Sequence, residues 1–554
     1  MALSPTQSQS QTVPNATFIS CDGYGHPGGA GDGITRDPAI WGIIPGLPAV
    51  GEREDISLTM GRVGLDACNA ALADARMSPN MWMRKVSLLR ARALHHLALN
   101  DPARALADLD LAQAAAVGHT DAYYDRSLGL GLDLVRAYAL RMKGDAAAAD
   151  ALTITTWKRR PYNIQVSLAA LLSLGVKGDP ADIESVNRGL ASVAPRWLDT
   201  LFQQMFERGR FKDVIAIYPQ LVPTTQRETA AYGQNLLEIH EANRMKTEVF
   251  WLLRGGQAAY ALAALGQADQ ARTVLDKTQA RVNTATEPLP PPDPNPDGTP
   301  GKPNKIVAVI LKNDAALARA APTAMAYFGR MVDLRNRLAQ GKVDEVAAAV
   351  LAPSFAPGPF GADLVAATIA DLTPATAGLK PKLAVLEARL LALRRPPTEA
   401  TPAALFKALP DAESPIKVAS YRKVGPLGGF LTGGDNGYRV TVDAQQVSHL
   451  TFRGHLSSRT IIEEMALLSA IDCARAAGAR GIVLLDSQDV EHVINHTYYG
   501  TVMSTQADGY ETDLTFIYAD PAAPPVELSQ APWRILSVDT VYAALSPFYI
   551  RSAK

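Results

Sequence analysis

The feature that most constrains the fold is a helix–turn–helix pattern that recurs between Leu89 and Val346. In its clearest copy, Leu89–Ala116, apolar residues recur every three to four positions on both sides of Asn100-Asp101-Pro102. Asp101 can cap the second helix, and Pro102 suits the first helical turn because its missing N–H is not needed there. Further copies turn at Gly144-Asp145, Gly209-Arg210, Gly266-Gln267 and, more weakly, Gly341-Lys342.

Small residues keep a constant distance across three of these turns. The interval is 12 residues in each pair, which are Ala93 and Ala105, Ala137 and Ala149, and Ala259 and Ala271. One such hairpin cannot bury its apolar face alone, so neighbouring hairpins must stack. The pattern resembles the tetratricopeptide repeat (TPR), which implies an α-solenoid with a groove for a protein or peptide partner. The competing interpretation is an irregular alanine-rich helical domain with chance matches.

Changes in composition divide the 554 residues into five segments. Eight prolines among residues 288–303 exclude regular helix and sheet there. We therefore expect a mainly α protein that ends in a small α/β (α+β) domain. The expected segments are an extended Gly-rich arm (1–50), helical repeats (51–284), a Pro-rich linker or loop (285–304), further helical repeats (305–425) and the small domain (426–554).

The last segment changes from helical to alternating patterns. Strands are expected at Tyr438–Val442, Val447–Phe452, Ile482–Leu485 and Asp513–Tyr518, and a closing helix at Val538–Leu545. Thr460 and Glu463 have the spacing of a capping box at the start of a helix. From Val440 to Tyr518 the pattern weakly resembles a small domain of proteobacterial lipoproteins of unassigned function, and this resemblance implies no catalytic residue.

Composition argues against several partners. The formal net charge is −1, and residues 438–554 carry 8 Lys+Arg against 13 Asp+Glu, so binding to nucleic acid is not expected. The sequence contains no run of 18 uncharged apolar residues, so no membrane span is expected. Association with a membrane complex remains an open alternative. The polar N-terminus does not read as a signal peptide, and no cofactor motif was found, so no cofactor is expected.

The best cluster of possible metal ligands follows the third expected strand. Asp489, His492 and His496 lie near one another in sequence, and two histidines four apart share one face of a helix. The same segment reads equally well as a strand or a surface loop. We therefore predict no metal site and keep these three residues as minor candidates.

Cysteine usage bears on the compartment. Cys473 lies in an apolar helix and is expected to be a buried free thiol. Cys21 and Cys68 either pair, which would indicate an oxidising compartment, or are buried independently. Pairing would place the chain in the periplasm or at the cell surface of a bacterium, with the cytoplasm as the alternative.

These observations predict a non-enzymatic, TPR-like scaffold that mediates protein–protein interaction in a bacterial cell envelope complex. The alternative is a metal-binding or enzymatic C-terminal module that the helical repeats target. A third class is an envelope assembly subunit with permanent contacts.

Overall fold

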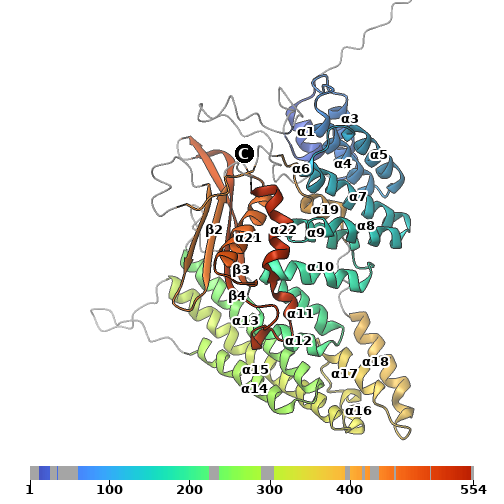
Figure 1. Cartoon of the computed structure of the whole chain (residues 1–554). Coiled ribbons are helices and arrows are strands. Elements are labelled where there is room, and N and C mark those ends of the chain that lie inside the picture. Colours follow the sequence, from blue (N-terminus) through green and yellow to red (C-terminus); the bar gives the residue numbers. More distant parts are fainter. Residues whose placement is uncertain are drawn as a thin grey trace, which may run out of the picture. The chain divides into compact units, whose positions relative to one another are not determined.

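The computed structural model describes residues 12–24, 34, 60–223, 236–287, 305–393, 400–414, 418–424, 436–454, 457–498 and 501–550. Side chains at 236–238, 306 and 493–508 are not described. The expected Pro-rich segment falls almost wholly outside these ranges, as does most of the expected N-terminal arm. The described residues are mainly helical, with an antiparallel sheet near the C-terminus, which confirms the coarse fold class (Figure 1).

The chain forms two compact units. The first combines residues 1–195, 397–525 and 532–554, and the second combines residues 196–396 and 526–531. The first unit therefore draws helices from the N-terminal part of the chain and strands from the C-terminal part. The segment boundaries expected from composition follow chain order, and they stay predictions.

The first unit begins with a series of helices, and those within residues 82–193 are joined by short connections. The helices are α1 (Asn15–Asp22), α3 (Arg62–Leu72), α4 (Trp82–Ala98), α5 (Pro102–Ala116), α6 (Ala122–Arg126), α7 (Leu128–Lys143), α8 (Ala146–Lys158), α9 (Ile164–Leu174) and α10 (Pro180–Val193), joined later by α19 (Pro402–Ala408). Asp101 accepts a hydrogen bond from the Arg104 N–H at 3.1 Å, which confirms the expected cap of α5.

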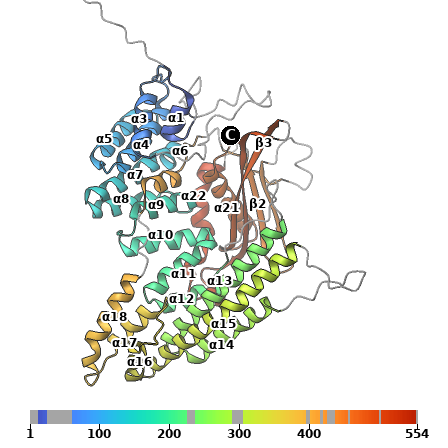
Figure 2. The same cartoon turned by 180° about the vertical axis from the view of Figure 1, so that it is seen from behind.

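A five-stranded antiparallel sheet completes the first unit, in the order β1-β2-β4-β3-β5. Its strands are β1 (Gly437–Val442), β2 (Ser448–Gly454), β3 (Gly481–Tyr498), β4 (Thr501–Ala519) and β5 (Leu536–Ser537). Helix α21 (Arg459–Ala476) packs on β2, β3 and β4, and α22 (Val538–Tyr549) packs on α21. Both views show these two helices between the strands and helices α9 and α10 (Figure 1, Figure 2). All four expected strands are present, and β3 and β4 extend well beyond the expected ranges.

The second unit is a series of helices, several of them long. They are α11 (Leu198–Glu207), α12 (Phe211–Ile217), α13 (Leu236–Ala264), α14 (Ala268–Ala285), α15 (Lys305–Ala339), α16 (Val343–Leu351), α17 (Gly361–Ala370) and α18 (Lys380–Leu393).

Short 3₁₀ turns at Pro195–Trp197, Tyr218–Gln220, Ala377–Leu379, Val526–Leu528 and Pro532–Arg534 complete the described elements.

Five helical hairpins in the described ranges share one turn geometry. The turn residue has a left-handed backbone in each case, namely Asn100, Gly144, Gly209, Gly266 and Gly341. The residue after it donates its N–H to the carbonyl five positions earlier, at 2.8–3.0 Å, which defines the same C-terminal cap every time. A buried residue lies seven positions before and five positions after each turn residue. These pairs are Ala93 and Ala105, Ala137 and Ala149, Phe202 and Val214, Ala259 and Ala271, and Leu334 and Val346.

The N-terminal segment differs from the extended arm that the sequence suggested, because residues 15–22 form helix α1 against α3 and α4. Phe18 is buried there, and Cys21 forms a disulfide with Cys68 of α3. Next to the disulfide, buried Asp22 pairs with buried Arg84 at 3.0 Å. The segment is polar in composition, so only these tertiary contacts, and not its periodicity, account for the helix.

Candidate functional site

The densest group of buried charges surrounds two consecutive residues of α21, Glu463 and Glu464. Thr460 and Glu463 do not form the expected capping box, because α21 begins at Arg459 and its Ser458 cap makes no side-chain cap hydrogen bond. Consecutive helical side chains project about 100° apart, so the two carboxyl groups enter different surroundings.

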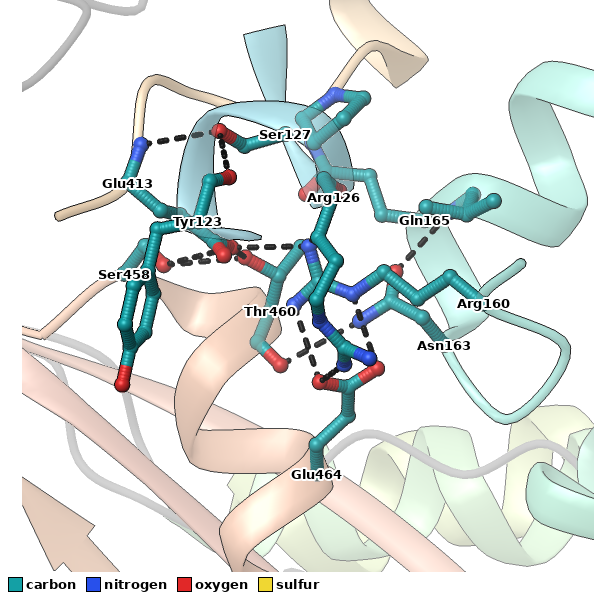
Figure 3. A network of polar contacts seen from close by, with 12 residues as sticks. Tyr123, Arg126, Ser127, Arg160, Asn163, Gln165, Glu413, Ser458, Thr460 and Glu464 are labelled. Atoms are coloured by element: carbon teal, nitrogen blue, oxygen red, sulfur yellow. Dashed lines mark hydrogen bonds and ion pairs between the residues drawn. The ribbon is translucent and has the colours of Figure 1, made fainter. Parts of the chain in front are cut away.

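Glu464 lies at the centre of a charged cluster built from three chain segments (Figure 3). Arg126, the last residue of α6, contacts its Oε2 at 2.6 Å, and Arg160, which follows α8, contacts its Oε1 at 2.8 Å. The hydroxyl of Tyr549 in α22 donates to the same carboxylate. Burial opposes ionisation of Glu464, but the two guanidinium charges outweigh it and lower its pKa to about 2.

A second carboxyl group, Glu413, extends the cluster. Its Oε1 lies 3.0 Å from Arg160 Nη1 and also accepts from the Thr460 hydroxyl. Its backbone N–H donates to Ser127 Oγ at 3.1 Å (Figure 3). The cluster thus opposes two guanidinium groups with two carboxyl groups in a buried space. Its contacts join residues far apart in the chain, since Arg126 and Glu464 are separated by 338 positions.

Such a cluster holds structure together rather than performing chemistry. Buried ion pairs contribute little net stability, but removing one partner leaves an uncompensated charge and costs about 3–5 kcal/mol. The side chains of Arg160 and Glu464 are fully buried, so a substrate in solvent does not reach them. We interpret the cluster as the junction that fixes α21 and α22 to the N-terminal helices of the first unit.

Glu463 has the opposite electrostatic setting. Its Oε1 lies 2.9 Å from Arg459 Nε, and Nη2 of the same arginine lies 2.6 Å from Asp489 Oδ2. Thr512 donates to the other oxygen of Asp489 at 2.8 Å. Burial and the nearby Asp489 carboxylate raise the pKa of Glu463 to about 8, against the effect of Arg459. Glu463 therefore keeps its proton at neutral pH and can donate it to Asp489.

Glu463 also lines a small internal cavity. The other lining residues are Tyr162, Ile164, Val193, Leu467, Leu484, Ser487, Thr512 and Leu514. The space open to the centre of a water molecule is about 10 Å³, which suits roughly one water. Ligand pockets typically measure about 300–1,000 Å³, so the cavity is far too small for a substrate. This arrangement can store a proton, and it offers no room for a reaction.

The candidate metal ligands Asp489, His492 and His496 do not lie on one face of a helix. They lie on strand β3, and Asp489 and His492 are three apart, an odd separation that places them on opposite faces of a strand. Asp489 binds Arg459, whereas His492 Nε2 lies 3.2 Å from Glu511 Oε2. The side chain of His496 lies outside the described residues. Within the described residues, no group of three or more His, Cys, Asp or Glu side chains is placed to hold a metal ion.

Sequence patterns assign Glu463 only to a capping box and do not single out Glu464 or Arg160. One signal was available, because Glu464 falls three residues after Ile461 and four before Leu468, on the apolar face of its helix. A charged residue at such a position needs a buried partner. The identity of that partner was not available from the sequence, because Arg160 is 304 positions away.

Comparison with protein-family models, with curated proteins and with solved structures finds no significant match to this chain.

Proposed function

We propose that this chain is a non-enzymatic, TPR-like scaffold that binds a protein or peptide partner in a bacterial cell envelope. The observation that carries the proposal is the turn geometry shared by five helical hairpins. Repetition of one turn and one pair of buried positions is typical of stacked helical hairpins, which offer extended surfaces for partners.

The two glutamate clusters support the non-enzymatic part of the proposal. The charges around Glu464 are buried and paired, and the cavity at Glu463 has room for about one water molecule. Neither cluster combines an exposed reactive group with space for a substrate. Both are better suited to stabilising the first unit than to catalysis.

The disulfide between Cys21 and Cys68 supports the envelope compartment, because structural disulfides form and persist in oxidising environments. The bridge closes a loop of 47 residues, and in the chain-entropy model this is worth about 4 kcal/mol of stability. Among the described helices, none is both long enough and apolar enough to cross a bilayer.

The first test is site-specific photocrosslinking in the native cell. A photoreactive residue would replace exposed Val63 of α3 or Leu111 of α5, with exposed Val442 of the sheet as the matched position. We expect discrete crosslinked partners from the helical positions, in a fixed stoichiometry. No crosslinks from the helices, or turnover of any substrate that is lost in His492→Ala, would contradict the scaffold proposal.

A thiol-trapped peptide map from the same cells tests the compartment separately. A peptide pair linked through Cys21 and Cys68 is the expected result. Free thiols at both positions would return the cytoplasm to favour and would leave the crosslinking result unaffected.

A further inference from the structure

Helix α18 is the last helix in the 196–396 segment of the second unit, and it packs on α17 and α16 (Figure 1, Figure 2). Its buried side chains are Leu383 and Leu390, which are seven residues apart and therefore share one face. Leu386 and Glu387 are half-buried beside them, and the other side chains of the helix are exposed. A terminal helix of a stack normally carries a polar outer face, because nothing covers it.

The outer face of α18 is instead apolar. Val385 is 71% exposed, Leu391 is 48% exposed and Leu393 is 72% exposed. Ala384 and Ala388 are exposed as well, and they connect Val385 with Leu391 around the helix surface at 100° per residue. Leu393 lies about 80° beyond Val385, past Arg389 and Lys382, and is not part of this face. In the described residues, no other helix exposes three large hydrophobic side chains.

Positive charges border this apolar face. Lys382 and Arg389 lie along one side of it and Lys380 along the other, and all three are exposed. The helix contains a single acidic residue, Glu387, and Arg394 and Arg395 follow it directly in sequence. Residues 380–395 therefore carry a formal charge of +4 (five basic residues against one acidic), within a chain whose total is −1.

We propose that α18 docks on an anionic lipid surface and lies parallel to it, with Val385 and Leu391 inserted among the acyl chains. An apolar stripe with basic residues on both sides is the pattern of an interfacial helix, since the apolar side chains enter the lipid and the basic ones reach the headgroups. Each Lys or Arg near an anionic membrane contributes about 1 kcal/mol, so charge and apolar burial act together.

Charge complementarity favours lipid over a second copy of the chain. A symmetric dimer through this face would bring two helices of charge +4 together and would place like charges opposite each other. An anionic bilayer instead presents negative charge and an apolar interior to the same helix. This inference does not rest on the scaffold function, because it concerns a separate surface.

The test is cosedimentation of the full chain with vesicles of phosphatidylglycerol and phosphatidylethanolamine, compared with vesicles of phosphatidylcholine. We expect binding to the anionic vesicles that weakens as salt rises. The variant Lys380→Gln/Lys382→Gln/Arg389→Gln should lower the partition coefficient by roughly 100-fold, about fivefold for each charge. The variant Val385→Ser/Leu391→Ser should lower it at least about tenfold, because it removes the inserted apolar area.

Two matched variants control for general loss of charge or of apolar surface. Arg62→Gln/Lys143→Gln/Lys158→Gln removes three exposed charges from the first unit, and Val63→Ser/Val117→Ser removes two exposed apolar side chains. Both should bind vesicles as the unaltered chain does, and the thermal unfolding of every variant should match it. All α18 substitutions fall on exposed residues, so unfolding is not expected to obscure the result.

Three outcomes would overturn the proposal. They are absence of binding to anionic vesicles at low salt, equal binding to anionic and zwitterionic vesicles, and binding that survives both α18 variants. Self-association that depends on concentration and is abolished by the serine variant, without vesicle binding, would assign the face to a second copy. Binding of an acidic protein under the same conditions would assign it to that class of partner.

Discussion

The opposite settings of Glu463 and Glu464 give a prediction that adjacent substitutions can test. Glu463 has its pKa raised from the ordinary value of 4.5 to about 8, so the folded chain keeps a proton that the unfolded chain releases. The stability that this bound proton contributes is therefore fully present below pH 4.5 and is lost as pH rises toward 8. Replacement by neutral glutamine in Glu463→Gln should remove this loss.

The magnitude follows from the same interval. Each pH unit between the unfolded and folded pKa values contributes about 1.4 kcal/mol, so the interval from 4.5 to about 8 sets an upper limit of about 5 kcal/mol. Arg459 and Asp489 interact electrostatically with Glu463. We therefore expect the free energy of unfolding to fall by about 2–5 kcal/mol across this pH interval. Tyr162, which lines the same cavity, stays protonated over this range because burial raises its pKa.

The assay is urea unfolding followed by far-ultraviolet circular dichroism from pH 5 to pH 9. Glu463→Gln should approach the unaltered chain in stability at pH 5 and exceed it at pH 9. Glu464→Gln is the matched control. Its free energy of unfolding should be about 3–5 kcal/mol below that of the unaltered chain at every pH from 6 to 9, because the substitution removes the carboxylate that pairs with Arg126 and Arg160. If Glu463→Gln is less stable than the unaltered chain at pH 9, Glu463 is ionised in the folded chain and the reasoning fails.

Three further predictions concern the turns and the disulfide. Gly266→Ala should lower the free energy of unfolding by about 1–2 kcal/mol, because its φ is 75°, although a Cβ there would meet no atom within 4 Å. Gly329→Ala, at an equally open site inside α15, should instead raise it by about 0.5–1 kcal/mol, and equal effects on urea midpoints would refute the backbone argument. Asn100→Gly should stabilise the chain by up to about 1 kcal/mol in the same assay, since its φ is 59°. Replacing Cys21 and Cys68 together by serine should cost about 4 kcal/mol, and unaltered thermal unfolding in that variant would show that the bridge adds nothing.

The local features of the fold could be predicted from the sequence. The sequence predicts both the cap by Asp101 and the first-turn position of Pro102, and the structure confirms them. The alternation of Tyr438–Val442 likewise predicts strand β1. These signals lie within a few residues of one another, so backbone preference and side-chain period suffice to detect them.

The features that depend on distant contacts could not be predicted in this way. Thr460 reads as part of a capping box, yet its hydroxyl binds Glu413, which is 47 positions earlier. Helix α1 forms in a polar segment because of its contacts with α3 and α4. The segment of His492 is compatible with a helix or a strand, and sheet pairing with β4 decides between them. Tertiary partners, and not local preference, determine each of these outcomes.

The junction around Glu464 has a consequence for synthesis of the chain. Arg160 leaves the ribosome 304 residues before the carboxylate that neutralises it. At about 5–20 residues per second, Glu464 is synthesised roughly 15–60 seconds after Arg160. The first unit therefore cannot reach its final packing during elongation. A chain that stops before Glu464 lacks the carboxylate that contacts both Arg126 and Arg160, so we expect its N-terminal helices to be less stable than in the full chain.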